Sequence, residues 1–390
     1  MTMFRILSLN QISARGLARL PETSYRVAAD IERPDAILLR SADLHHFPIP
    51  ASVVAVARAG AGTNNVPVSA LSARGIPVFN APGANANAVK ELVLAALLIA
   101  ARNLVPALHY VALLDKSNEL EQQVEAGKKQ FAGVELPGRR LGIVGLGAIG
   151  SLVADTALKL GMRVIGFDPQ ITVDAAWRLP ASVVKASRLE DLVRQSDFIT
   201  LHVPLIEATR KLVDARLIGL MKPGAVLLNF ARDGIVDNAA IISALRSQHL
   251  KSYLCDFPSA ELIGESGVVA LPHLGASTEE AEENCVSMVC QQLREFLEQG
   301  CIHNAVNFPD VEMVRESPYR LAIANSNVPN MLSQISAALA TAGLNIHNMV
   351  NKSRADMAYT LVDVDSPVPS SVLAALSAID GVLSVRLVPA

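Results

Sequence analysis

A glycine-rich turn at residues 145–150, with the sequence GLGAIG, points to chemistry more directly than any other segment. An apolar run precedes the turn and an apolar-periodic segment follows it, so it is expected to join a strand to a helix. Its glycines permit a tight turn and let the backbone approach a pyrophosphate, which a helix N-terminus attracts. The next predicted strand ends in Asp168, whose carboxylate suits ribose hydroxyls and repels a 2′-phosphate. We therefore predict that the chain binds NAD in preference to NADP.

His273 is the predicted proton-transfer group. It follows a strand predicted over 268–271, and side chains at strand ends collect where open α/β sheets bind ligands. A histidine beside a nicotinamide cofactor can take a hydroxyl proton while hydride moves. A nearby carboxylate would raise its pKa and fix its tautomer, and spacing alone leaves three candidates open: Asp256, Glu261 and Glu265.

Arg232 is the predicted anion-binding residue. It lies just beyond a strand predicted over 225–230, where polar residues follow an apolar run. A guanidinium there can bind a substrate carboxylate through two parallel hydrogen bonds. An ordinary surface arginine in a loop is the alternative interpretation.

The elements that must position these residues alternate along the chain. Strands are predicted over 4–9, 36–39, 53–57, 76–79, 141–144, 163–167, 198–203, 225–230 and 268–271. Helical segments separate them, including one long apolar helix over 89–114 and another over 277–299, which favours parallel sheets covered on both faces. The last part of the chain has the order strand–helix–strand–strand–helix–strand, typical of a ferredoxin-like domain.

Composition narrows the function classes. The 390 residues are 51% hydrophobic, which excludes a mainly disordered chain. A net charge of −3 gives no electrostatic reason to bind nucleic acid or an anionic membrane, so neither is predicted as a partner. The four cysteines have no metal-ligand spacing, which predicts reduced thiols, no metal site and a cytoplasmic location. The N-terminus is expected to be a strand rather than a signal peptide.

Taken together, these segments resemble the D-isomer-specific 2-hydroxyacid dehydrogenase family. The resemblance is carried by the glycine turn with Asp168, by DFITLHVP at 197–204, by MKPG at 221–224 leading to Arg232, and by PHLGAST at 272–278. The C-terminal part resembles an ACT regulatory domain. The match covers essentially the whole chain and narrows to the short branch of the family that oxidises 3-phospho-D-glycerate to 3-phosphohydroxypyruvate with NAD, the first step of L-serine biosynthesis.

The resemblance implies an α/β fold in three domains. A Rossmann-type NAD-binding domain (90–275) is inserted into a flavodoxin-like substrate-binding domain (1–89 plus 276–305). A linker (306–317) then leads to a βαββαβ ferredoxin-like ACT domain (318–390). In this family the helix that begins near residue 89 pairs two subunits, so a homodimer or homotetramer is expected.

The resemblance also assigns roles to residues. Arg232 matches the substrate-binding arginine, His273 the acid/base histidine and Glu261 its paired glutamate. Glu261 ends the segment DFPSAE, which lacks the family's following proline, and Asp233 stands where the family usually has glycine. The assigned cofactor-binding residues are Gly145, Gly147, Ala148, Ile149, Gly150, Asp168, His202, Pro204, Ala231, Asp256 and Gly275, with Asp256 at the position that contacts the nicotinamide carboxamide.

Substrate and effector residues are assigned in the same way. Arg40 and Ser41 resemble the pair that binds the substrate phosphate, and Asn85 matches an asparagine near the substrate. Two further cations, Arg58 and Lys90, have no assigned role. In the ACT domain, Asn325, Asn327 and Asn345 are the predicted allosteric residues for L-serine, although Asn325 stands where serine-sensitive relatives have histidine. An ACT domain that serves assembly alone is the alternative.

Two other functions remain open. The chain could act on another D-2-hydroxy acid or its oxo acid, such as glyoxylate, hydroxypyruvate or 2-oxoglutarate. It could also be an NAD-responsive binding module, like the corepressors of this family. The intact set of Arg232, Glu261 and His273 favours an enzyme over such a module.

Overall fold

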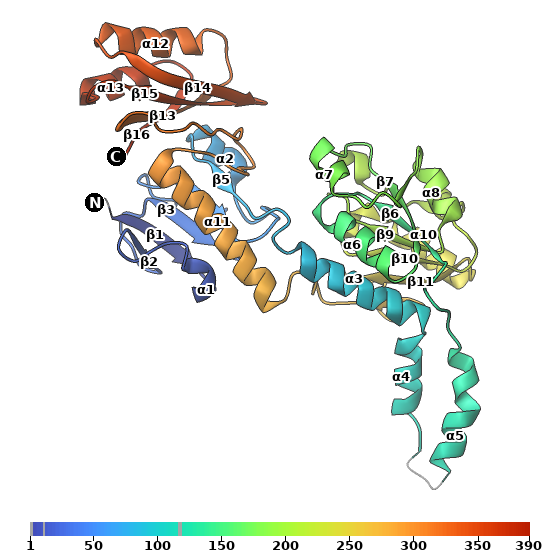
Figure 1. Cartoon of the computed structure of the whole chain (residues 1–390). Helices are drawn as coiled ribbons and strands as arrows, with labels where there is room; N and C mark the ends of the chain where they lie inside the picture. Colours follow the sequence, from blue (N-terminus) through green and yellow to red (C-terminus); the bar gives the residue numbers. More distant parts are fainter. Residues whose placement is uncertain (1–2, 11, 116–118) are drawn as a thin grey trace. The chain divides into compact units, whose positions relative to one another are not determined.

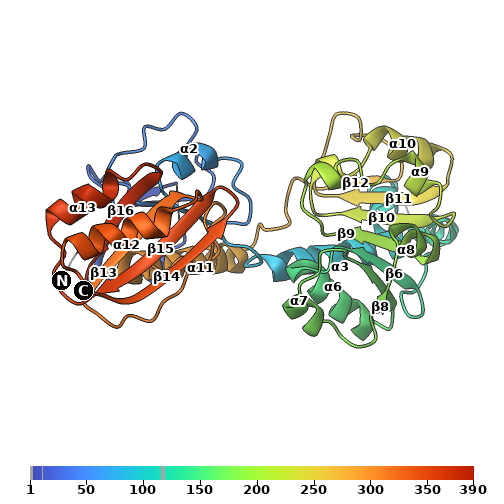
Figure 2. The same ribbon diagram turned by 90° about the horizontal axis from the view of Figure 1, so that it is seen from above.

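The computed structural model describes residues 3–10, 12–115 and 119–390. The chain forms two compact units, one of Met1–Asn85 with Glu279–Ala390 and the other of Ala86–Thr278 (Figures 1 and 2). The first unit holds most of the predicted substrate-binding domain and the predicted ACT domain, and the second holds the glycine turn.

A parallel five-stranded sheet forms the centre of the first unit's N-terminal part. Its order is β2 (Tyr25–Ala28), β1 (Phe4–Leu9), β3 (Ala36–Leu39), β4 (Ala55–Arg58), β5 (Val78–Phe79), which is the flavodoxin-like order. Strand β3 is apolar and buried throughout, as expected of a parallel strand covered on both faces. The long helix α11 (Glu279–Gln299) packs on one face together with α1 (Ala14–Leu17), and α2 (Val68–Ala73) packs on the other.

The second unit contains a parallel seven-stranded sheet. Its order is β12 (Val268–Ala270), β11 (Leu250–Cys255), β10 (Ala225–Asn229), β9 (Phe198–Leu201), β6 (Arg140–Val144), β7 (Arg163–Phe167), β8 (Val184–Lys185). Helices α3 (Ala86–Ala101) and α6 (Ala148–Lys159) cover one face, while α8 (Leu189–Gln195), α9 (Ala215–Ile218) and α10 (Asn238–Arg246) cover the other. This doubly wound order is that of a Rossmann fold, so the predicted fold class is confirmed.

The single helix predicted over 89–114 is wrong. Helix α3 ends at Ala101, α4 runs from Leu104 to Ala112, and the two are bent by 67°. Pro106 explains the break, because a proline inside a continuous helix would clash with the carbonyl of Arg102 four residues earlier. Helix α5 (Leu120–Gly127) returns beside α4, and we call α4 and α5 the arm (Figure 1). No single helix in the described ranges is long and apolar enough to span a membrane, although α3 and α4 taken together meet that criterion as a bent pair.

The C-terminal part has the predicted βαββαβ order. Strands β13 (Tyr319–Ser326), β14 (Ile346–Arg354), β15 (Met357–Val364) and β16 (Val382–Val388) form an antiparallel sheet in the order β14-β15-β13-β16. Helices α12 (Met331–Thr341) and α13 (Ser370–Ser377) pack on one face. The other face joins the core built around α11, with buried Tyr359 and Leu361 among its contributions.

Two arginines attach the ACT sheet to α11. Arg320 is fully buried, pairs with Asp363 at 2.7 Å, and donates to the carbonyl oxygens of Gln299, Met313 and Val314. Arg386 lies 4.3 Å from the centre of the Phe296 ring and donates to two carbonyls at the end of α11. The predicted linker also packs into this core, through fully buried Phe308 and Val311. The domain boundaries themselves stay predictions.

Candidate active site

The carboxyl ends of the second unit's strands bring the predicted chemistry to one edge. In a parallel sheet these ends meet at the same side, where open α/β folds bind ligands. The residues that follow successive strands are Gly145 after β6, Asp168 after β7, His202 after β9, Ala231 and Arg232 after β10, Asp256 after β11, and His273 after β12.

The three glycines of the turn differ in what they require. Gly145 has φ of +92°, and a Cβ there would lie 2.6 Å from the carbonyl oxygen of His202. A Cβ on Gly150 would lie 2.0 Å from the carbonyl oxygen of Gly145, so both positions exclude a side chain. Gly147 faces open space and begins α6 without a side-chain cap. The open position at a helix N-terminus fits the pyrophosphate of a dinucleotide.

Asp168 is held in place by the turn that it faces. Its two carboxylate oxygens accept hydrogen bonds from the backbone N–H groups of Leu146, at 2.9 Å, and Gln170, at 3.0 Å. Each oxygen keeps a second lone pair for another donor. The carboxylate is therefore fixed beside the glycine turn and keeps acceptor capacity, while its contact with a ribose hydroxyl stays a prediction.

His202 presents an unpaired buried atom beside the same turn. Its Nε2 lies 3.0 Å from the Thr200 hydroxyl, whereas its Nδ1 is buried without a hydrogen-bond partner among the described residues. Burial lowers the pKa of His202 to about 3, so the ring is neutral at physiological pH. A buried polar atom normally has a partner, and a bound cofactor can supply one. Together with the open space at Gly147, this atom makes the site fit NAD.

Asp256 holds the turn that carries His273. Its side chain is 1% exposed, and its two oxygens accept from the backbone N–H groups of Leu274 (2.6 Å) and Gly275 (2.7 Å). His273 lies after β12 and just before Leu274. Its φ is +57°, a conformation that a residue with a side chain rarely adopts. Asp256 therefore fixes the backbone on which His273 stands. Its predicted contact with the nicotinamide carboxamide stays a prediction.

Glu261 and His273 are both exposed, and within the part of the chain that the structure describes no hydrogen bond or ion pair joins them. The ring of Phe257 lies edge-on to His273 instead, with the ring centres 5.0 Å apart. The structure thus places Glu261 in the loop after β11 but does not bring it to His273. Its role as the paired carboxylate remains a prediction.

Buried Asn229 positions Arg232. The Asn229 amide donates to the backbone carbonyl of Arg232 at 2.9 Å and approaches the Tyr253 hydroxyl at 3.3 Å. One guanidinium N–H of Arg232 donates to the Ala231 carbonyl, and the side chain is exposed. Across the described ranges no ion pair links Arg232 to Asp233, so this carboxylate leaves the guanidinium available. Sequence reasoning assigned no role to Asn229 or Tyr253, because their contact depends on the pairing of β10 with β11.

Arg40 and its supporting residues lie in the first unit, directly after β3. The guanidinium of Arg40 forms an ion pair with Glu282 in the first turn of α11. Its carbonyl accepts from the Arg58 side chain at 3.1 Å and from Asn65 at 3.2 Å. Arg58, which the sequence left unassigned, and Asn65 therefore fix the loop after β3. Ser41 is exposed beside Arg40, and Asn85 is half-buried just before α3.

The three ACT asparagines are separated. Asn325 is 1% exposed and donates to the Ser326 carbonyl, so its amide is enclosed in the domain. Asn327 follows β13, at the end of the sheet where Ser326 pairs with Met357. Asn345 precedes β14, at the other end, where Ile346 pairs with Val364. Met357 and Val364, which mark these ends, are seven positions apart on β15, about 23 Å at the usual strand rise, so one ACT domain cannot place both asparagines on one small ligand.

Comparison with known proteins shows the family to which the chain belongs. Residues 107–275 match the model of the D-isomer specific 2-hydroxyacid dehydrogenase NAD binding domain. The chain is 35% identical to the D-3-phosphoglycerate dehydrogenase of Escherichia coli K12 over 340 residues, which is 84% of this chain and 79% of that protein. The chain belongs to the D-isomer specific 2-hydroxyacid dehydrogenase family. Its second unit carries the NAD-binding domain of this family.

Other family members match over different lengths. The chain is 36% identical to the D-3-phosphoglycerate dehydrogenase of Methanocaldococcus jannaschii over 275 residues, 68% of this chain but only half of that protein. Among solved structures, apo D-mandelate dehydrogenase of Rhodotorula graminis is similar with a TM-score of 0.65 and 26% identity, covering 76% of this chain and 96% of that one. The shared fold therefore extends beyond the residues matched by the NAD-binding model.

Proposed function

We propose that this chain catalyses the NAD-dependent oxidation of 3-phospho-D-glycerate to 3-phosphohydroxypyruvate, the first step of L-serine biosynthesis. The observation that carries the proposal is the single sheet edge on which the glycine turn, Arg232 and His273 meet. The relatives named D-3-phosphoglycerate dehydrogenase, at 34–36% identity, support the choice of substrate.

The glycine turn, Asp168 and His202 would hold the cofactor. When bound, NAD supplies the acceptor for the hydride of substrate C2. His273 takes the proton of the C2 hydroxyl, and the hydrogen bonds of Asp256 keep its turn in place during this transfer. Arg232 binds the substrate carboxylate through the guanidinium N–H groups that the Ala231 carbonyl does not use. Glu261 is proposed to stabilise the imidazolium form of His273.

The phosphate is proposed to bind Arg40 and Ser41, with Asn85 as a further polar group. Arg40 is already paired with Glu282, so a phosphate must share or displace that carboxylate. A phosphate carries more charge than a carboxylate and accepts several charge-assisted hydrogen bonds, which favours this exchange. The ion pair predicts that substrates without a phosphate bind poorly here.

A substrate panel tests the proposal. Turnover would be followed by nicotinamide absorbance at pH 8 to 9, with NAD and either 3-phosphoglycerate or glycerate, and with NADH and glyoxylate, hydroxypyruvate or 2-oxoglutarate. The expected result is a kcat/KM for 3-phosphoglycerate at least 100-fold above that for glycerate. Equal values would remove the phosphate site, and no turnover of any substrate would favour a binding module.

We further propose that the chain is a cytoplasmic homodimer or homotetramer that L-serine inhibits. The arm supports assembly, since Leu108 and Val111 of α4 are 71% and 59% exposed. The separation of Asn327 from Asn345 supports a ligand held between two ACT domains, one asparagine from each. L-Serine should lower activity through a coupling of about 1–3 kcal/mol. The test is a titration of the wild type and of Asn345→Ala, and a wild type indifferent to millimolar serine would leave the ACT domain with assembly alone.

A further inference from the structure

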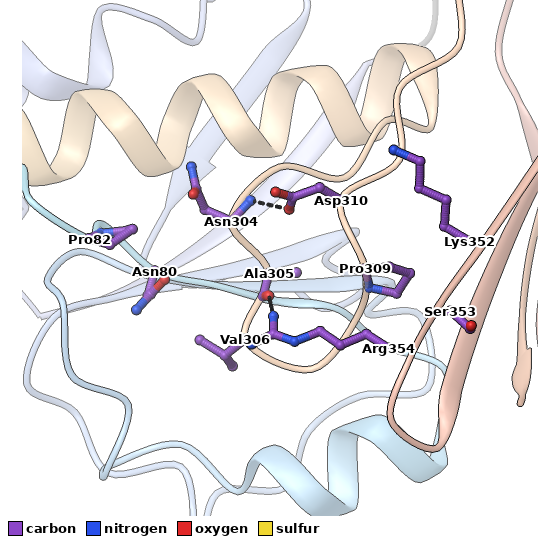
Figure 3. A pocket seen from close by; sticks show the side chains of 10 residues that line it. All are labelled: Asn80, Pro82, Asn304, Ala305, Val306, Pro309, Asp310, Lys352, Ser353 and Arg354. Atoms are coloured by element: carbon purple, nitrogen blue, oxygen red, sulfur yellow. Dashed lines mark hydrogen bonds between the residues drawn. The ribbon is translucent and has the colours of Figure 1, made fainter. Parts of the chain in front are cut away.

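A pocket of about 640 Å³ lies in the first unit between the end of β14 and the segment 304–310 (Figure 3). Hydrogen bonds and pairing fix both of its walls. Arg354 of β14 donates to the Ala305 carbonyl at 3.0 Å, and Ala305 itself pairs with Phe79 at the end of β5. The lining residues used below are Asn80, Pro82, Asn304, Asp310, Lys352 and Arg354.

Charges of both signs line this pocket without neutralising one another. Lys352 and Arg354 are two residues apart on one strand, so their side chains leave the same face of β14 and extend toward segment 304–310 (Figure 3). Asp310 stands on the opposite wall and accepts from the backbone N–H of Asn304 at 2.8 Å. Among the residues placed by the structure, the side-chain ammonium of Lys352 has no hydrogen bond or ion pair, and Asp310 pairs with neither cation.

We propose that this pocket binds a free α-amino acid. The carboxylate of such a ligand matches Lys352 and Arg354, and its ammonium matches Asp310 on the facing wall. The amide oxygens of Asn80 and Asn304 are further acceptors for the ammonium, because the Asn80 amide nitrogen is already used by the Ala61 carbonyl. A ligand with only a carboxylate leaves Asp310 without an opposite charge, and a ligand with only an ammonium leaves Lys352 and Arg354 without one. The inference rests on the pocket and not on the proposed reaction.

The pocket differs from the position predicted for L-serine between ACT domains. Asn345 stands before the first residue of β14, whereas Lys352 and Arg354 stand at its end. The pocket also touches a segment that leads to the predicted substrate residue Asn85, since Asn80 and Pro82 lie five and three residues before it. The chain segment from Asn80 to Asn85 therefore connects this pocket to the loop before α3.

Calorimetry on the full chain tests the proposal without substrate or cofactor. The probes are L-serine and glycine, which carry both charges, propionate and ethylamine, which carry one each, and inorganic phosphate. Titrations in an Asn345→Ala background remove the other predicted site. The two amino acids should bind at least 10-fold more tightly than the singly charged probes. Within that background, Lys352→Ala and Asp310→Asn should each weaken amino-acid binding at least 10-fold, and Lys352→Arg should preserve it.

Lys128→Ala is the matched control, because Lys128 is an exposed cation of the second unit and should leave binding unchanged. Phosphate binding as tight as that of serine would make the pocket a simple anion site and overturn the proposal. Unchanged affinity in Lys352→Ala and Asp310→Asn would overturn it equally. Since binding is read without turnover, an inactive chain that still binds amino acids would contradict the proposed function alone.

Discussion

His273 stands in a left-handed backbone conformation that its neighbours must hold, and buried Asp256 is the group that holds it. Asp256→Asn leaves one accepting oxygen and turns an NH₂ group toward a backbone donor. A hydrogen bond to a charged group contributes about 1.5–3 kcal/mol, so the free energy of unfolding should fall by that amount and kcat should fall with it. Urea unfolding and steady-state kinetics measure both. Asp233→Asn, at an exposed carboxylate, is the control, and equal stability of the two variants would contradict this role.

The proposed proton transfer gives the second prediction. His273→Gln should lower kcat by about 10²- to 10⁴-fold, the usual contribution of a general acid or base. The affinity for NAD should stay close to that of the wild type, because the glycine turn is unchanged. Kinetics with 3-phosphoglycerate and NAD titration by fluorescence separate the two quantities. Turnover at the wild-type rate would exclude His273 as the base.

His202 predicts a pH dependence of stability. Burial lowers its folded pKa to about 3, while the unfolded chain has the ordinary value of about 6.5. Between these values the unfolded chain binds a proton that the folded chain does not. Stability from this residue is therefore complete above pH 6.5 and is lost as pH falls toward 3, by at most about 1.4 kcal/mol per pH unit.

Urea unfolding between pH 7 and 5 measures this dependence. His202→Gln should show a flatter slope of unfolding free energy against pH, whereas His46→Gln, at an exposed histidine, should keep the wild-type slope. Identical slopes in the wild type and His202→Gln would show that the buried ring does not titrate as described.

Several site residues were predictable from sequence, because their positions follow from where strands end. Gly145, Asp168 and His273 were placed after apolar runs, and the structure puts them on one sheet edge. The contact of Phe257 with the His273 ring was not predictable, since it depends on how the loop after β11 folds. The ion pair of Arg40 with Glu282 also lay beyond sequence reasoning, because these residues are 242 positions apart.

At the scale of elements, the docking of β13 onto α11 depends on Arg320. Its guanidinium has five hydrogen bonds, two of them to Asp363, and no exposure. Arg320→Ala leaves the buried Asp363 carboxylate without its cation and removes a donor from each of three carbonyls, so we expect a loss of about 3–5 kcal/mol in unfolding free energy. Arg246→Ala, which breaks an exposed pair with Glu265, should change the unfolding free energy far less, because water screens that pair. Denaturant unfolding measures both free energies. Similar losses in the two variants would contradict the role of Arg320 in attaching β13 to α11.

The structure differs from the strand and helix predictions where a distant partner or a single proline decides the local fold. Strand β11 was missed because Lys251 and Ser252 interrupt its apolar run. In the fold, the Lys251 ammonium donates a hydrogen bond to the Ala100 carbonyl at 2.9 Å. The last turn of α3 thus supplies an acceptor for this charged group. The bend after α3, in contrast, has a signal in the sequence, because Pro106 cannot continue a helix that began at Ala86. The βαββαβ order was predicted correctly because each of its elements has a clear period of its own.

At the scale of the whole molecule, the arm predicts assembly. No residue of α4 is buried, and Leu108 and Val111 are 71% and 59% exposed. Apolar surface of this kind marks an interaction site, and a second copy of the chain is the proposed partner. Leu108→Glu should shift the protein toward monomer in sedimentation equilibrium. Val173→Glu, at a residue 72% exposed but outside the arm, should not, and equal behaviour of both variants would place the interface elsewhere.

The length of helix α11 fixes the distance between the two ends at which it is attached. Its first turn carries the partner of Arg40, and carbonyls in its last turn accept from Arg386. An added residue would lengthen the helix by about 1.5 Å and rotate one end by about 100° relative to the other, so Glu282 or Phe296 would leave its partner. A substitution changes one contact, whereas an insertion or deletion misaligns all contacts beyond it. Among related chains with the same two attachments, this helix should therefore diverge in sequence while keeping its length of 21 residues.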